Sequence, residues 1–100
     1  MSIIESNITK IQDLCSKHNV YRLFVFGSAL TSKFSKTSDI DFVVSFNEIS
    51  LYDYADNYFD LKSSLERLFQ RPVDLLEDKA IKNPFLRKSI DSSKKIVYGH

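Results

Sequence analysis

Two apolar segments on either side of a short polar stretch place the strongest limit on how this chain folds. Residues 20–26 read VYRLFVF and residues 39–46 read DIDFVVSF, and Gly27-Ser28 directly follows the first segment. β-Branched and aromatic residues dominate both segments, which is typical of strands. Successive apolar positions in 20–26 give such a strand an apolar side chain on each face. We therefore expect 20–26 to be a central strand that ends at Gly27.

The rest of the chain alternates between helical and strand patterns. Apolar residues recur with helical spacing over 3–18 and 51–69. Asn83 followed by Pro84 is typical of a helix start. The sequence predicts, in order, a helix over 3–18, a strand over 20–26, a short helix and loop over 28–38, a strand over 39–46, a helix over 51–69, a strand over 73–76, a helix over 85–91 and a strand over 94–99. This order predicts one α/β domain over residues 1–100, with a small mixed sheet and helices mainly on one face.

Composition excludes several classes of protein. The chain has 100 residues, a net charge of +1 and no basic tail or stripe, which argues against an electrostatic nucleic-acid binder. No apolar stretch reaches membrane-spanning length, so no membrane association is expected. Cys15 is the only cysteine, and we expect a cytoplasmic protein in which it packs in the core. His18 is expected on the helix surface.

The segment 39–46 carries the first candidate chemistry. Side chains alternate along a strand, so Asp39 and Asp41 share one face while Ile40, Phe42 and Val44 share the other. The apolar set is expected to pack under helices, which leaves the two aspartates in an open groove. Two nearby carboxylates repel each other unless a cation lies between them. Oxygen ligands of this kind suit Mg²⁺ bound together with substrate phosphates.

Asp74 and Gly27-Ser28 extend the candidate site. Asp74 is a charge one residue into the short apolar strand VDLL, and pairing of that strand with 39–46 would place it beside Asp41. Three carboxylates are able to hold two metal ions for an in-line displacement. Gly27 allows close approach of a ligand to the backbone, and Ser28 is expected to cap the following helix, whose first N–H groups bind anions.

Each of these residues also has a simpler explanation. Gly27-Ser28 alone fits a turn that ends a strand and caps a helix, and Asp39 alone fits a solvated residue at a strand start. Lys33 and Lys36 are either phosphate contacts or solvated loop charges. Tyr52 and Phe59 lie off the apolar stripe of the helix over 51–69 and could mark a partner surface.

Taken together, the spacing resembles a known signature. Gly27-Ser28, ten intervening residues and Asp39-Ile40-Asp41 resemble the G-S-x10-D-x-D motif of the DNA polymerase β-like nucleotidyltransferase superfamily. Within this superfamily, the chain most closely resembles the minimal nucleotidyltransferases (MNT domains). The resemblance lies in its length, in the segment SDID at 38–41 and in the segment VDLL with Asp74. The resemblance implies the polymerase β-like fold, with Asp39, Asp41 and Asp74 as catalytic and metal-binding residues and Gly27 and Ser28 as nucleotide-binding residues.

The resemblance also implies an activity and a partner. MNT domains use two Mg²⁺ ions to transfer a nucleoside monophosphate to a hydroxyl group, which for this chain implies AMP taken from ATP. Many MNT domains are antitoxins of HEPN-domain toxins, so the resemblance implies a partner of that kind. The chain departs from the family in one segment. Where many members have G-S-x-A-R-G, this chain has Ala29-Leu30-Thr31-Ser32 after Gly27-Ser28, without arginine. Two hypotheses therefore stand: an Mg²⁺-dependent enzyme that modifies a partner protein, or a catalytically weak module that neutralises a toxin by occlusion.

Overall fold

A four-stranded mixed sheet forms the centre of the molecule. The computed structural model describes residues 2–31 and 34–99. The strands are β1 (Val20–Phe26), β2 (Ile40–Phe46), β3 (Val73–Glu77) and β4 (Lys95–Tyr98), in the spatial order β3-β2-β1-β4. β1 is antiparallel to both of its neighbours, whereas β2 and β3 are parallel. This parallel pair requires a crossover connection, which a helix supplies.

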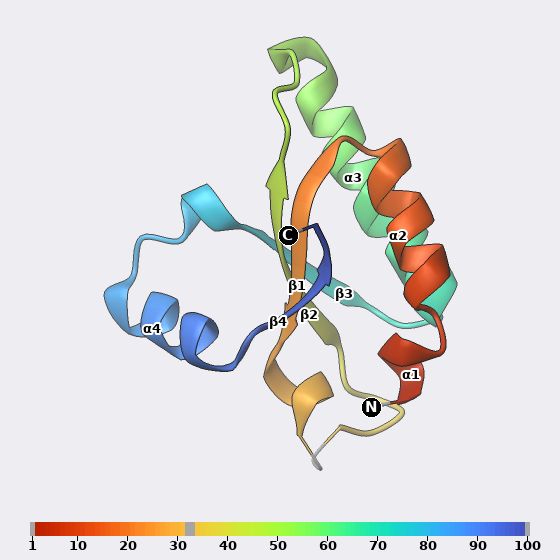
Figure 1. The fold of residues 1–100 in the computed structure, drawn as a ribbon, viewed down its shortest axis with the longest axis vertical. Coiled ribbons are helices and arrows are strands. Elements are labelled where there is room, and N and C mark those ends of the chain that lie inside the picture. Colours follow the sequence, from red (N-terminus) through yellow and green to blue (C-terminus); the bar gives the residue numbers. More distant parts are fainter. Residues whose placement is uncertain (1, 32–33, 100) are drawn as a thin grey trace.

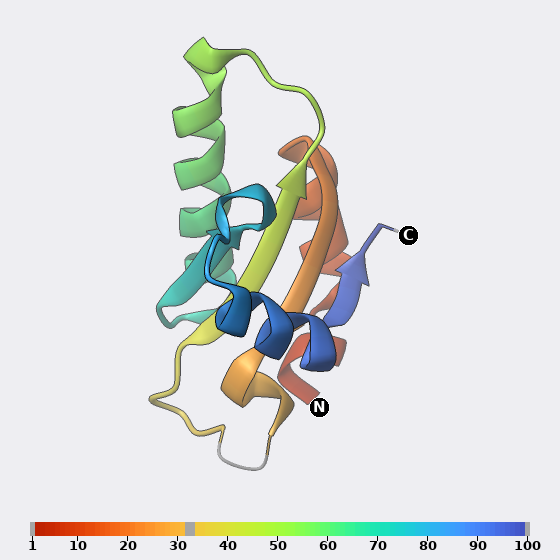
Figure 2. The same ribbon diagram turned by 90° about the vertical axis from the view of Figure 1, so that its left-hand side faces the viewer.

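Helices cover the two faces of the sheet unequally. One face carries α1 (Ser2–Glu5), α2 (Ile8–Lys17) and α3 (Leu51–Phe69), while α4 (Pro84–Ser93) lies against the other face (Figures 1 and 2). Two short 3₁₀ turns, η1 (Gly27–Leu30) and η2 (Asp78–Ala80), follow β1 and β3. The predicted mixed α/β sheet with helices mainly on one face is confirmed.

The core lies between the sheet and the first three helices. Ile40, Phe42 and Val44 are fully buried there, as their spacing predicts, and β1 contributes Leu23 and Val25. α2 adds Ile11 and Cys15 from its apolar side. Burial raises the pKa of the Cys15 thiol to about 12, so this thiol is an inert core group at neutral pH.

Two local expectations were wrong. The predicted helix over 3–18 is broken into α1 and α2, because the Asn7 side-chain amide donates to the carbonyl oxygen of Ile3 at 2.9 Å and interrupts the helical ladder. His18 is buried rather than exposed. Its Nδ1 lies 2.6 Å from the carbonyl oxygen of Leu14 and its Nε2 lies 2.5 Å from Asp60 Oδ2, so it joins the end of α2 to α3.

The remaining helix signals behave as the sequence indicates. The Asn83 side chain accepts hydrogen bonds from the backbone N–H groups of Phe85 and Leu86, at 2.8 and 3.2 Å, and Pro84 occupies the first turn of α4. α3 spans the predicted residues and ends at Gln70, which has a φ of 53°. Within the described residues, no helix is both long and apolar enough to cross a membrane.

Candidate active site

Three strands meet at the end of the sheet where the candidate residues lie. Asp41 is opposite Phe26, the last residue of β1, in the antiparallel pair. In the parallel pair Asp41 is opposite Asp74. Gly27 directly follows Phe26, so Asp41, Asp74 and the Gly27-Ser28 turn lie together at one end of the sheet. We call this end, together with Asp39, the corner. The pairing of β2 with β3 thus places Asp74 beside Asp41, as the sequence analysis anticipated.

Gly27 is fitted closely to Asp41. Its φ is +76°, a left-handed conformation that glycine adopts without strain. A Cβ atom at this position would collide with Oδ2 of Asp41 and would lie 3.3 Å from its Cγ. Glycine is therefore favoured here by its backbone conformation, and any side chain at this position would have to push the Asp41 carboxylate aside.

The three aspartates form a site of concentrated negative charge. Asp41 is partly buried, whereas Asp39 and Asp74 are exposed. Burial raises the pKa of Asp41, and the charges of Asp74 and then Asp39 raise it further. Asp39 lies one residue before β2 rather than inside the strand, so its position depends on the preceding loop.

The Gly-Ser turn differs from expectation. Ser28 does not cap a helix: it is the second residue of η1, and Phe26 occupies the N-cap position without a side-chain cap. The carbonyl oxygen of Ser28 accepts hydrogen bonds from the N–H and hydroxyl of Thr31, both at 2.9 Å. A single turn carries little helix dipole, so any phosphate binding here depends on individual N–H groups and the Ser28 hydroxyl.

The donor chemistry of the corner fits a hard divalent cation. Asp39 and Asp41 supply carboxylate oxygens, and Asp74 adds a third group close enough to raise the pKa of Asp41. In the described part of the chain, no group of three His, Cys, Asp or Glu side chains is arranged so that it could hold a metal ion without rearrangement. Such repelling carboxylates favour separate orientations when no cation joins them. The metal-ligand assignment of Asp39, Asp41 and Asp74 stays a prediction.

Sequence reasoning missed Arg71, which organises the loop before Asp39. Its Nη1 donates to the carbonyl oxygens of Ser35 and Ser38 at 2.9 and 3.0 Å, and its guanidinium lies 4.7 Å from the centroid of the Phe34 ring. Arg71 precedes β3, so it connects the approaches to the two strands that carry the aspartates. The sequence marks this residue only as the position before Pro72, where a helix must end.

The lysines of the loop give no support to a phosphate contact. Lys36 is exposed in the turn that precedes Asp39, and Lys33 lies outside the described residues. Ala29 of η1 is buried. A phosphate contact by Lys33 or Lys36 stays a prediction.

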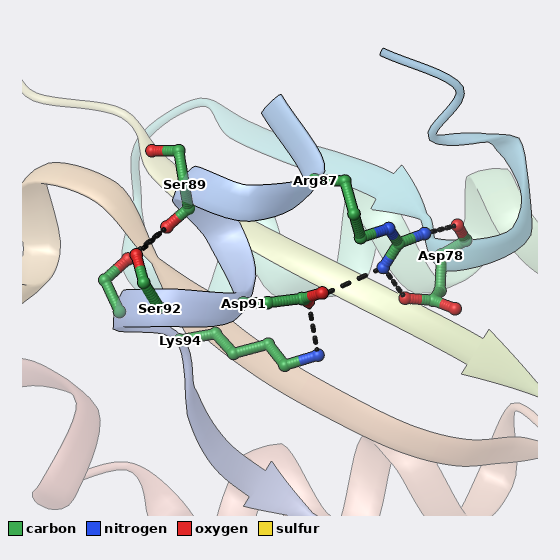
Figure 3. Close-up of polar contacts among 7 residues, drawn as sticks. Asp78, Arg87, Ser89, Asp91, Ser92 and Lys94 are labelled. Carbon is green, nitrogen blue, oxygen red and sulfur yellow. Dashed lines mark hydrogen bonds and ion pairs between the residues drawn. The ribbon is translucent and has the colours of Figure 1, made fainter. Parts of the chain in front are cut away.

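α4 lies against the face of the sheet opposite α1, α2 and α3 (Figure 2), and ion pairs hold it there (Figure 3). Asp41 points to the same face, because its strand neighbours Ile40 and Phe42 point into the core. Arg87 binds η2 through both Oδ1 and the carbonyl oxygen of Asp78, at 2.8 and 2.6 Å. Asp91 lies 3.6 Å from Arg87 Nη1 and 2.9 Å from Lys94 Nζ. Lys94 also lies 4.3 Å from the centroid of the Phe24 ring on β1. These contacts fix α4 to η2 and to the β1 residue Phe24.

Comparison with known proteins identifies the family. The sequence profile described as Polymerase beta, Nucleotidyltransferase matches residues 9–100. The chain belongs to this nucleotidyltransferase family. It is 35% identical over 78 residues to MJ1379 of Methanocaldococcus jannaschii, described as a candidate protein adenylyltransferase, and the match covers 78% of this chain and 77% of that protein.

Solved structures show the same fold. A structure described as a candidate minimal nucleotidyltransferase has a TM-score of 0.71 and 29% identity, covering 92% of this chain and 90% of its own. A second match is one chain from a structure of a tri-AMPylated HEPN toxin of Shewanella oneidensis in complex with an MNT antitoxin. It has a TM-score of 0.67 and 19% identity to this chain, and the match covers 96% of this chain and 72% of that one. The expected polymerase β-like fold is therefore confirmed.

Proposed function

We propose that this protein transfers AMP from ATP to a hydroxyl group of a partner protein and releases pyrophosphate. The observation that carries the proposal is the register that sets Asp74 beside Asp41, with Gly27 packed against Asp41. The match to the nucleotidyltransferase family and the similarity to a candidate protein adenylyltransferase support the reaction and the class of acceptor.

Each residue of the corner has a proposed part in the reaction. Asp39 and Asp41 would hold Mg²⁺ beside the substrate phosphates, and Asp74 would complete a second metal site and orient the acceptor hydroxyl. When bound, Mg²⁺ neutralises phosphate charge and makes the acceptor hydroxyl a better nucleophile. Gly27 gives the nucleotide close access to the backbone, and Ser28 offers a hydroxyl to the phosphates. The acceptor hydroxyl gives up its proton to solvent as its oxygen forms a bond to the α-phosphorus, and the bond from that phosphorus to the pyrophosphate oxygen breaks.

We propose a HEPN-domain toxin as the partner. The support is the fold shared with a chain from the complex of an AMPylated HEPN toxin and an MNT antitoxin. The test is incubation of the protein with α-labelled ATP, Mg²⁺ and the product of the neighbouring gene, which the proposal expects to be a HEPN-domain protein. Label on the partner is expected with the wild-type protein and is expected to be absent with Asp41→Asn. No label with the wild-type protein would overturn the proposed activity.

The second hypothesis, neutralisation by occlusion alone, keeps one observation in its favour. Gly27-Ser28-Ala29-Leu30-Thr31 corresponds to G-S-x-A-R in the family pattern, so Thr31 stands where many members carry an arginine that could bind phosphate. If occlusion suffices, the Asp41→Asn variant still neutralises the toxin in a growth assay. If transfer is required, the same variant loses neutralisation while it still binds the partner.

A further inference from the structure

The strand that carries Asp74 lies at the edge of the sheet. In the order β3-β2-β1-β4, the described part of β3 pairs with β2 on one side only. Successive residues of a strand direct their backbone groups to opposite edges, so those of Val73 and Leu75 face away from β2. Unpaired groups on an edge are costly when buried and leave the strand free to shift.

α3 supplies partners for both of these outward-facing residues. The Glu66 carboxylate accepts a hydrogen bond from the N–H of Val73 at 3.0 Å. The Tyr58 hydroxyl donates a short hydrogen bond to the carbonyl oxygen of Leu75. Val73 and Leu75 are the two neighbours of Asp74 in the chain. The backbone on either side of Asp74 is therefore held by β2 at one edge and by α3 at the other.

Tyr58 and Glu66 belong to one stripe of the helix. Tyr58, Lys62 and Glu66 are spaced four residues apart, so they lie on the same side of α3. Lys62 Nζ lies 3.3 Å from Glu66 Oε2, and both side chains are one-third exposed. This ion pair orients the carboxylate toward the N–H of Val73, because it limits the rotamers open to Glu66.

Both groups keep the protonation states that these bonds require. The hydrogen bond from Val73 is the main reason that the pKa of Glu66 is lowered, and the Lys62 ammonium lowers it further. Burial raises the pKa of Tyr58, and the charge of Asp74 adds to this rise while Lys62 opposes it. At neutral pH Glu66 is thus an ionised acceptor and Tyr58 a protonated donor.

We propose that Tyr58 and Glu66 are positioning residues, which hold β3 so that Asp74 stays beside Asp41 during nucleotide transfer. This inference rests on the function proposed above. Neither residue contacts the substrate; each acts through the backbone next to Asp74. A shift of about 1 Å in a reacting group is able to cost roughly 100-fold in rate, so a small movement of this edge strand is enough to matter.

The test compares Tyr58→Phe with Tyr54→Phe. Both variants remove one hydroxyl from α3, but the Tyr54 hydroxyl has no hydrogen-bond partner within the described residues. For Tyr58→Phe we expect kcat for transfer to fall on the order of 10-fold to 100-fold, with the KM for ATP unchanged. We also expect faster hydrogen exchange at the Asp74 amide by NMR. For Tyr54→Phe we expect wild-type values of both.

Glu66 provides an independent second arm. Glu66→Ala removes the acceptor for the Val73 N–H and is expected to lower kcat and speed exchange at Asp74 in the same way. Glu66→Gln keeps a side-chain oxygen at this position and is expected to restore most of both properties. A role limited to general stability would instead shift the melting temperature of all these variants without this split between kcat and KM.

The outcomes separate the two proposals. Equal kcat and equal exchange in Tyr58→Phe and Tyr54→Phe would overturn the positioning role. Failure of Glu66→Gln to differ from Glu66→Ala would overturn the part assigned to Glu66. A wild-type protein that transfers no AMP would overturn the proposed function. In that case, exchange at Asp74 would still support or refute the proposal that α3 fixes β3.

Discussion

Gly27 lies so close to the Asp41 carboxylate that a Cβ atom at position 27 would collide with Oδ2 of Asp41. The contact links the end of β1 to the start of β2, so a side chain at position 27 would displace the Asp41 carboxylate. Gly27 and Asp41 are thus in direct contact, and a substitution at either residue should change the position of the other.

Gly27→Ala is expected to reduce both stability and metal response. A left-handed non-glycine residue costs on the order of 1–3 kcal/mol, and each kcal/mol lowers the melting temperature of a domain this size by roughly 4–8 °C. The new methyl group must also displace Asp41, so the rise in melting temperature on addition of Mg²⁺ should be lost. Thermal unfolding with and without Mg²⁺ measures both effects.

Gly99→Ala is the matched control for this change. Gly99 has a φ of +92°, and a Cβ there would collide with the carbonyl oxygen of Tyr21, away from the aspartates. We expect a similar loss of stability with a wild-type response to Mg²⁺. A normal metal response in Gly27→Ala would show that Asp41 does not need the space beside Gly27.

Asp41→Asn is expected to stabilise the metal-free protein and to abolish its stabilisation by metal. The folded-state pKa of Asp41 is raised, so the wild-type protein loses stability as the pH rises through that pKa and keeps it fully below the ordinary pKa of 3.8. The gain from the substitution should therefore appear at neutral pH and vanish in acid. Water screens half-exposed carboxylates, so we expect no more than about 1 kcal/mol.

The expected effect of Asp41→Asn on stabilisation by Mg²⁺ is larger than its effect on the metal-free protein. Mg²⁺ at about 100 times its dissociation constant stabilises a folded protein by about 2.7 kcal/mol, which the wild-type protein should show and Asp41→Asn should not. Asp56→Asn, a change at an exposed aspartate of α3, serves as control and should keep the response. Equal responses of wild type and Asp41→Asn would remove Asp41 from the metal site.

The local sequence pattern was sufficient to predict the bounds of those elements in which apolar burial and secondary-structure propensity agree. The bounds of β1 and α3 match those read from the sequence, because each has a clear apolar periodicity and a definite end, at Gly27 and before Pro72. The break in the first helix was missed. It depends on one hydrogen bond from the Asn7 side chain, which competes with a helical pattern that is otherwise intact.

Contacts across long sequence separations explain the other differences. His18 is buried because Asp60, forty-two residues later, comes to lie beside it when α2 packs against α3. In the site, alternation within a strand and the charge of Asp74 were enough to predict its place beside Asp41. Arg71, Tyr58 and Glu66 carry no such local signal, because each acts through a backbone group of another element.

Arg71→Lys is expected to loosen the loop before Asp39. A lysine keeps the charge but lacks the planar guanidinium that bonds the carbonyl oxygens of Ser35 and Ser38 and stacks on Phe34. We expect weaker Mg²⁺-dependent ATP binding by calorimetry, with a decrease in melting temperature equivalent to about 1–2 kcal/mol.

Arg67→Lys is the control for this loop. Arg67 bonds only to Ser64 of its own helix in the described contacts, at 3.0 Å. Its replacement should leave ATP binding at the wild-type level. If both variants bind ATP equally well, the position of Asp39 does not depend on Arg71.

Asp74→Asn tests the third carboxylate. Asp74 is an exposed residue of an edge strand, so a purely structural role predicts little change in stability or activity. As the proposed group that orients the acceptor, it acts mainly in the transition state. The variant should then bind ATP much as the wild-type protein does, through Gly27, Ser28 and the Asp39-Asp41 pair. Its transfer rate should fall on the order of 100-fold or more.

Binding and transfer should be measured on the same Asp74→Asn sample, by calorimetry with a non-hydrolysable ATP analogue and by transfer of α-labelled AMP. Glu77→Gln is the control, because Glu77 is a second carboxylate of β3 that pairs with Lys79 at 3.2 Å, and this variant should transfer AMP at the wild-type rate. A weak transfer rate accompanied by equally weak ATP binding would place Asp74 in nucleotide binding instead. Transfer by Asp74→Asn at the wild-type rate would leave a site built from Asp39 and Asp41 alone.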